Sequence, residues 1–265
     1  MIGAIIGDIV GSRFEFNNYR KKDFDFFSNE CFATDDSVMT LAVAKAIMES
    51  KPDYSDLADN TVKYMQLIGK KYPDAGYGIR FGRWLYLDEP EPYYSWGNGS
   101  AMRVSPCGFA AKTLEEAEKI AGITASVTHN HPEGITGAQS VAAAIFMARN
   151  NSSMDEIRKY ISDKYYKDDF TLDEIRETYQ FNESCRDTVP QAFEAFYESV
   201  DFEDCIRNAI SVGGDSDTLA AIAGGIAEAY YGVPDNLRKK ALSYLDDFQT
   251  EIFNEFNDYI NNSVL

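Results

Sequence analysis

The sequence has few of the residues that build disulfide frameworks. Four of its 265 residues are cysteine, and none of these forms a Cys-x-x-Cys pair. A chain of this length does not need disulfides to hold its core together. We therefore expect reduced thiols in a cytoplasmic protein. Cys107 follows a proline at a helix end, and we interpret it as a packing residue.

Histidine is scarcer still, which argues against zinc. The two histidines, His129 and His131, stand in a short connector, and the cysteines are scattered. A catalytic zinc site needs about three ligands at a recognisable spacing. A turn or substrate-contact role without a metal is therefore favoured for both histidines. The sequence also lacks the adjacent His-Asp of one class of metal phosphohydrolase and the Gly-x-Ser-x-Gly elbow of many serine hydrolases.

Basic charge and long apolar runs are also lacking. The chain has 25 basic and 43 acidic residues, a net charge of −18. This balance argues against a stable nucleic-acid complex or an anionic membrane surface as partner. The sequence has no run of about 18 apolar residues, which is the length needed to span a bilayer. The apolar N-terminal segment has no basic flank, so we do not expect a signal peptide.

Strand alternation is absent, whereas helical periodicity recurs along the chain. The apolar residues predict helices over 2–10, 38–49, 54–71, 115–127, 132–149, 189–199, 202–212, 219–231, 236–245 and 248–260, with a less regular one over 79–87. A strand is the less favoured alternative for 2–10. Without a βαβ rhythm, the glycine loop 97–99 is not a dinucleotide fingerprint; it should lead into a short helix that Pro106 limits. We predict one all-α domain over residues 1–265.

Two segments differ from this pattern. Gly3, Gly7 and Gly11 recur every four residues, which leaves one helix face bare and permits another backbone to approach closely. Residues 150–186 are more polar, and we expect them at the surface with the least regular structure. Their role is left open.

Carboxylates gather at three helix ends. These are Asp8 with Glu15, the run Thr34-Asp35-Asp36, and the run 215–218 (DSDT) after two glycines. The simplest interpretation is three independent helix caps. However, carboxylate and hydroxyl oxygens are the ligands that Mg²⁺ and Mn²⁺ prefer, and buried carboxylates are costly unless paired or metal-bound. Three such ends on apolar helices favour one shared metal site.

Five motifs, in order, resemble those of the ADP-ribosylglycohydrolase family, which includes the enzyme that removes ADP-ribose from dinitrogenase reductase. The segments are 7–15 (GDIVGSRFE), 34–37 (TDDS), 97–103 (GNGSAMR), the run from Thr128-His129 through Pro132 to Gly137-Ala138, and 215–218 (DSDT). Each is weak alone, but the ordered set is specific. The resemblance extends from Gly3 to about Pro234, and segment 150–186 matches nothing in it.

The resemblance implies an all-α, orthogonal multi-helix domain with a central buried cleft that holds two Mg²⁺ or Mn²⁺ ions. The implied metal ligands are Thr34, Asp35, Asp36, Asp215, Asp217 and Thr218. Glu15 corresponds to a glutamate on a mobile loop near the metals, and this glutamate is implicated in catalysis. Asp35 and Asp36 are the other candidates for a catalytic role. The implied substrate contacts are Asn98, Gly99, Ser100, Met102 and His129.

The expected function is metal-dependent hydrolysis of the glycosidic bond between ADP-ribose and a modified target, which reverses ADP-ribosylation. Arginine or another protein side chain is the expected target, ahead of nucleic acid or a small molecule. Two alternatives are a non-catalytic binder of ADP-ribose or a related nucleotide, and a metal-dependent nucleotide phosphohydrolase. The sequence does not decide the linkage cleaved, the preferred metal, the general acid or base, or the oligomeric state, although a monomer is favoured.

Overall fold

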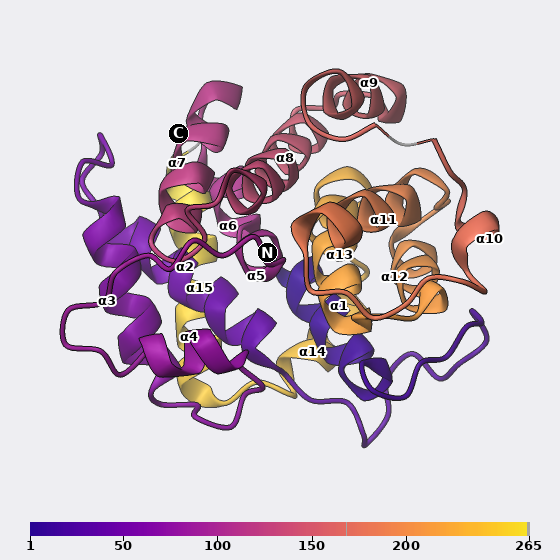
Figure 1. Cartoon of the computed structure of the whole chain (residues 1–265), viewed down its shortest axis with the longest axis horizontal. Helices are drawn as coiled ribbons and strands as arrows, with labels where there is room; N and C mark the ends of the chain where they lie inside the picture. The colour runs from indigo at the N-terminus through magenta and orange to yellow at the C-terminus, as the bar shows by residue number, and fades with distance from the viewer. Residues whose placement is uncertain (168, 264–265) are drawn as a thin grey trace.

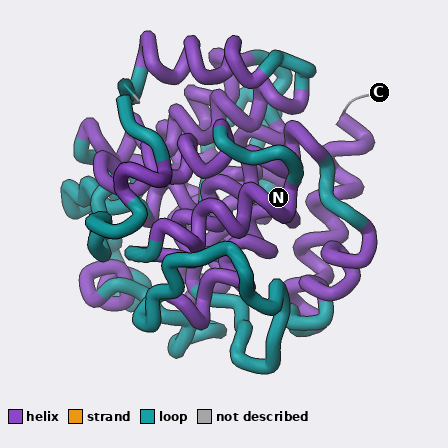
Figure 2. Tube along the Cα trace, turned by 90° about the vertical axis from the view of Figure 1, so that its right-hand side faces the viewer, coloured by secondary structure: helices purple, strands orange, loops and turns teal. Residues whose placement is uncertain are grey.

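Helices joined by loops make up the residues that the computed structural model describes, 1–167 and 169–263, and no strand occurs among them (Figures 1 and 2). The all-α prediction is therefore confirmed. The helices are α1 (Ile2–Gly11), α2 (Asp35–Met48), α3 (Leu57–Gly69), α4 (Ile79–Trp84), α5 (Gly99–Met102), α6 (Ser105–Ala110), α7 (Leu114–Ser126), α8 (Pro132–Arg149), α9 (Met154–Lys164), α10 (Leu172–Ile175), α11 (Cys185–Tyr197), α12 (Phe202–Val212), α13 (Ser216–Tyr231), α14 (Asp235–Leu242) and α15 (Asp247–Ser263), with a 3-10 turn, η1 (Ser12–Phe14). None of the described helices is long and apolar enough to cross a membrane.

The helix predicted over residues 2–10 is confirmed as α1, and every residue of it is buried. The prediction that Pro106 limits a short helix is wrong, because α5 ends at Met102 and Pro106 lies in the first turn of α6. Proline is favoured there because the first turn of a helix does not need its amide hydrogen. All four cysteines are unpaired and buried, as expected for reduced thiols.

Helices α1 and α13 lie side by side in the centre of the molecule (Figure 1). Their backbones approach so closely that a Cβ atom added to Gly7 would lie 2.0 Å from the Ala220 carbonyl oxygen. One added to Gly11 would lie 2.5 Å from the Asp217 Cα atom. The glycine face of α1 therefore permits the close backbone approach that its spacing predicts. It also brings the end of α1 against the start of α13, where the acidic motif 215–218 begins.

Segment 150–186 is mostly exposed, as predicted, and contains α9 and α10. Its last residues bond to the chain around the glycine loop. The amide of Asn98 donates to the Glu183 carbonyl at 2.7 Å, and the amide of Cys185 donates to the Trp96 carbonyl at 3.0 Å. These bonds form an isolated antiparallel bridge between Gly97 and Ser184. The unassigned segment therefore ends beside the glycine loop.

The close crossing of α1 and α13 predicts that Gly7→Ala destabilises the fold. Alanine favours a helix by about 1 kcal/mol over glycine, but overpacking a core costs about 1–3 kcal/mol or more. A contact of 2.0 Å to a backbone oxygen cannot relax by a rotamer change. We expect a net loss of about 2 kcal/mol in the free energy of unfolding, measured by urea denaturation.

The matched control is Gly78→Ala, because no atom lies within 4 Å of a Cβ atom added there. This change should stay within about 0.5 kcal/mol of the parent chain. Equal stability of both variants would show that the crossing is not as tight as described.

Candidate metal centre and ligand cleft

A cleft of about 510 Å³ lies where the end of η1 and the N-termini of α2, α5 and α13 converge. Its acidic wall consists of Glu15, Asp35, Asp36, Asp215 and Asp217. The residues of the glycine loop, with Met102 and His129, form a second wall. Most residues predicted for the site therefore share one cavity. Thr34 and Ser100 are buried outside its lining.

Three of the acids stand close enough to share one ion. Carboxylate oxygens of Glu15, Asp215 and Asp217 all lie within 4.8 Å of one another. Asp215 occupies the N-cap position of α13 but makes no capping bond with its side chain. Its Oδ2 instead accepts a hydrogen bond from Asn98 Nδ2 at 2.7 Å. The simple capping interpretation is therefore wrong for Asp215, since its side chain points to the cleft.

The run at the start of α2 supplies the other acids. Thr34 caps this helix by accepting the Asp36 amide hydrogen at 3.2 Å. One oxygen of Asp36 accepts a hydrogen bond of 3.4 Å from Oγ1 of Thr218, which lies on α13. The other oxygen, Oδ1, is buried and has no hydrogen-bond partner among the described residues. A buried carboxylate oxygen without a donor is costly unless a cation or proton satisfies it.

Asp8, on α1, fixes the start of α2 beside this wall. Its carboxylate accepts from Thr34 Oγ1 at 2.6 Å, from the Thr34 amide at 3.0 Å and from the Ser37 amide at 3.0 Å, and also from the Ser37 hydroxyl. Burial nevertheless raises the pKa of Asp8 to about 6. With its oxygens occupied by these donors, Asp8 acts as a structural link between α1 and α2.

Burial and mutual repulsion raise the pKa values of the wall. Burial and the charges of Asp215 and Asp8 raise the pKa of Glu15 to about 7. Burial and the neighbouring carboxylates raise the pKa of Asp35 to about 8. The same causes place the pKa values of Asp36 and Asp217 well above the ordinary range. A cation would relieve both the desolvation and the repulsion.

The donor set fits a hard divalent cation. The acidic wall offers carboxylate oxygens, with the hydroxyl of Thr218 beside them, and these are the ligands typical of Mg²⁺ and Mn²⁺. The unpaired Asp36 Oδ1 and the convergence of Glu15, Asp215 and Asp217 are the observations that support this fit. The chain therefore contains an acidic group that could hold metal.

The predicted substrate contacts divide into two groups. Asn98, Gly99, Met102 and His129 line the cleft, whereas the Ser100 hydroxyl donates to the Gly134 carbonyl at 2.7 Å beneath the loop. His129 Nδ1 lies 2.8 Å from Thr128 Oγ1, and burial with nearby Arg103 holds its pKa well below the usual range. This shift favours the neutral imidazole of His129. His131 caps α8 by accepting the Glu133 amide hydrogen, which agrees with a turn role.

Several cleft residues were not predicted from the sequence. Phe16 and Phe181 stack with ring centroids 6.0 Å apart at the cleft, and Glu183 lies beside them. Phe16 follows Glu15 directly, so its position could have been inferred. Nothing in the sequence indicated Phe181 or Glu183, because the bridge between Gly97 and Ser184 brings them there.

Comparison with known proteins points to one family. The sequence model of a family described as ADP-ribosylglycohydrolase matches residues 1–262. The cattle protein "ADP-ribosylhydrolase ARH3" is 27% identical, over 92% of this chain and 88% of its own length. "ADP-ribosylarginine hydrolase Tri1" of Pseudomonas putida is 28% identical, over 96% of this chain and 76% of its own.

A solved structure has the same fold. It is titled "ADP-ribosylglycohydrolase-related protein complex", and it matches with a TM-score of 0.71 and 21% identity. The match covers 100% of this chain and 96% of that one. At this identity the likeness concerns the fold alone.

The raised pKa values predict that the metal-free protein loses stability as the pH rises from about 5 to about 8. In this window the folded chain keeps protons on Glu15 and Asp35, whose pKa values are about 7 and about 8, while the unfolded chain has released them. The folded state then binds more protons, so the free energy of unfolding falls with rising pH. Melting temperatures of chelator-treated protein across this range measure the effect.

Asp35→Asn should flatten this pH dependence, because it removes one of the carboxylates that must ionise. Asp88→Asn is the control, since Asp88 is an exposed residue outside the cleft lining. A melting temperature that rises steadily from pH 5 to pH 8 in the metal-free parent would contradict the prediction.

Proposed function

The chain belongs to the ADP-ribosylglycohydrolase family of enzymes, and we propose that it hydrolyses the glycosidic bond between ADP-ribose and a modified target. The observation that carries this proposal is a single cleft that is lined both by the acidic wall and by the predicted substrate loop. We further propose arginine or another protein side chain as the target, which the name of the Pseudomonas relative supports. On this proposal, residues 1–265 form one ADP-ribosylglycohydrolase-like domain.

Two Mg²⁺ or Mn²⁺ ions are the proposed cofactors, with ligands drawn from Thr34, Asp35, Asp36, Asp215, Asp217 and Thr218. Five of these residues line the cleft, and Thr34 is buried next to them. The ions would supply the positive charge that orients the ribose hydroxyls and activates water. The raised pKa values support the proposal, because each describes a carboxylate that lacks an opposite charge.

The remaining chemistry falls to the side chains. As the bond to the ribose C1″ atom breaks, positive charge develops on the ribosyl ring, and the carboxylates of the cleft stabilise it. Glu15, Asp35 and Asp36 are the candidates for moving the proton. Glu15 is half-buried at the cleft, and a pKa of about 7 would suit a group that both takes and gives a proton near neutral pH.

Binding of the rest of the substrate is assigned to the glycine loop. Asn98 donates hydrogen bonds to both Asp215 and Thr188, and these bonds fix the position of the glycine loop relative to the acidic wall. His129 packs beneath Gly99, where its Nε2 would lie 3.2 Å from an added Cβ atom. The loop residues Gly97, Asn98 and Gly99 all line the cleft. The cytoplasmic location and the monomeric state stay predictions from the sequence.

The deciding experiment measures release of ADP-ribose from ADP-ribosylated arginine, serine and DNA thymidine, with Mg²⁺, with Mn²⁺ and with chelator. We expect release from at least one substrate, dependent on the metal. Asp35→Ala and Asp217→Ala should each lower kcat by about 100-fold or more, because each removes charge stabilisation at the reacting centre. Exposed Asp88→Ala should leave kcat unchanged.

Other outcomes would support the alternatives. Calorimetric binding of ADP-ribose without turnover of any substrate would indicate a binder. Release of phosphate or AMP from ADP-ribose would indicate a phosphohydrolase. Full activity in both aspartate variants would contradict the metal site.

A further inference from the structure

The loop that follows Glu15 is fastened to the turn that precedes Asp215. This turn, Gly213–Gly214, has φ angles of 76° and 74°, a conformation that glycine adopts easily and other residues rarely do. Two successive glycines also leave the backbone free to adopt other conformations. The position of Asp215 therefore depends on contacts that the turn makes with other parts of the chain.

Asn18 makes the most direct of these contacts. Its Oδ1 accepts the Gly214 amide hydrogen at 2.9 Å, and its Nδ2 donates to the Gly214 carbonyl at 3.0 Å. The same Nδ2 lies 3.0 Å from the Glu15 carbonyl and 2.9 Å from the Phe14 carbonyl. One carboxamide thus bonds the backbone of Glu15 and the residue immediately before Asp215.

Arg20 fastens the same loop a second time. Its guanidinium donates to the carbonyls of Val212 at 2.6 Å and Tyr179 at 2.5 Å, and also to that of Arg176. The Tyr179 ring lies against the turn, since a Cβ atom added to Gly214 would lie 2.4 Å from its Cε1 atom. The glycine turn is therefore enclosed by Asn18, Arg20 and Tyr179.

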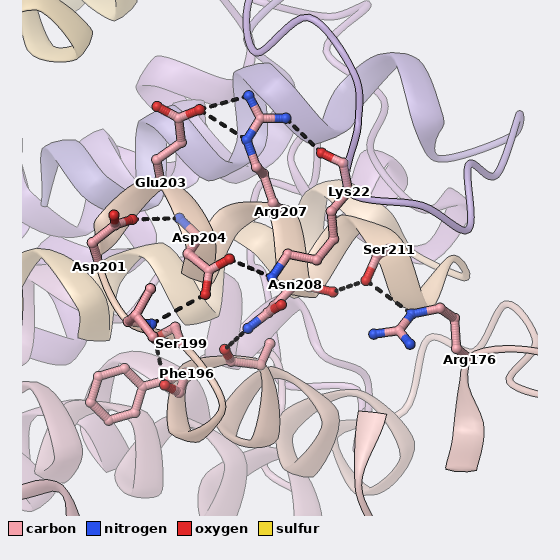
Figure 3. Close-up of polar contacts among 12 residues, drawn as sticks. Lys22, Arg176, Phe196, Ser199, Asp201, Glu203, Asp204, Arg207, Asn208 and Ser211 are labelled. Carbon is pink, nitrogen blue, oxygen red and sulfur yellow. Dashed lines mark hydrogen bonds and ion pairs between the residues drawn. The ribbon is translucent and has the colours of Figure 1, made fainter. Parts of the chain in front are cut away.

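The far part of the loop is held on α12, the helix that leads into the turn (Figure 3). Lys22 pairs with Asp204, while Arg207 donates to the carbonyls of Lys22 at 2.7 Å and Phe24 at 2.8 Å. Glu203 orients Arg207 through bonds of 2.9 and 2.6 Å. The loop thus runs along α12 and cannot shift without breaking several polar contacts.

We propose that Asn18 is a positioning residue, which holds Glu15 against Asp215 and Asp217, and that Arg20 supports it in this role. This inference rests on the proposed function, because it assigns the two residues a part in that reaction. The side chain of Asn18 bonds to backbone groups of Phe14, Glu15 and Gly214, so it acts by fixing the Glu15 backbone against the turn, and its effect on the rate requires the Glu15 side chain. Misplacement of a catalytic group by about 1 Å can cost about 100-fold in rate.

The kinetic test compares Asn18→Ala with Asn17→Ala. Asn17 is the adjacent residue, also exposed and of the same type, and its side chain makes no hydrogen bond among the described residues. We expect Asn18→Ala to lower kcat by about 10- to 100-fold with KM changed less than twofold, and Asn17→Ala to leave both unchanged. A kcat within twofold of the parent in Asn18→Ala would overturn the proposal.

A double-mutant cycle separates positioning from a general loss of stability. If Asn18 acts through Glu15, then adding Asn18→Ala to the Glu15→Gln variant should lower its kcat by less than about threefold. A full, independent loss in the Glu15→Gln background would mean that Asn18 acts elsewhere, and would refute the assignment. Arg20→Gln, compared with Lys21→Gln at an exposed neighbour, gives the same test if Asn18→Ala folds poorly.

A third measurement does not depend on activity. Hydrogen exchange of the metal-free protein should rise in both peptides 12–20 and 210–218 in Asn18→Ala, and in neither in Asn17→Ala, with the melting temperature nearly unchanged. Unchanged exchange in 210–218 would contradict the coupling. If the parent releases no ADP-ribose, the proposed function fails on that result alone, and exchange still decides whether Asn18 couples the two segments.

Discussion

The backbone crossing of α1 and α13 is the constraint on which the cleft depends. Gly3, Gly7 and Gly11 present no side chains, so α13 lies directly on the α1 backbone. As a result, the chain leaves α1 at the point where α13 begins, and η1 delivers Glu15 next to Asp215 and Asp217. If side chains lay between α1 and α13, the two helices would be farther apart and these carboxylates would separate. Core packing at the crossing and the geometry of the acidic wall are therefore the same property of the molecule.

Asp8 extends this arrangement to the third helix. It lies on α1 between Gly7 and Gly11, and its carboxylate accepts hydrogen bonds from both the backbone and the side chains of Thr34 and Ser37. Those bonds satisfy amide hydrogens at the start of α2, which no helical carbonyl can reach. Because Asp35 and Asp36 occupy the first turn of α2, their positions follow from that of Asp8. One central helix thus places both acidic runs, which are about 180 residues apart in the chain.

The sequence predicted much of this arrangement and missed the rest for physical reasons. Helical periodicity located the long helices, and the glycine spacing predicted the close crossing, because both signals are local. The acidic runs could be assigned to one site because carboxylates at the ends of apolar helices need a common partner. Phe181 and Glu183 could not be placed, since their approach depends on one bridge between Gly97 and Ser184. The inward orientation of Ser100, toward Gly134, likewise depends on how α5 meets α8.

Repulsion within the acidic wall opposes the fold, so the wall depends on contacts with groups outside it. They come from neutral or distant groups: the glycine crossing, the bonds to Asp8, the amide of Asn98 and the carboxamide of Asn18. None of these contacts requires a bound cation. The carboxylates are therefore held near one another before any ion arrives, and the folded chain already bears the cost of their proximity. A cation that bound there would displace the protons that Glu15 and Asp35 keep near neutral pH, and it would find the carboxyl groups already ordered, which is the advantage that preorganisation gives to binding.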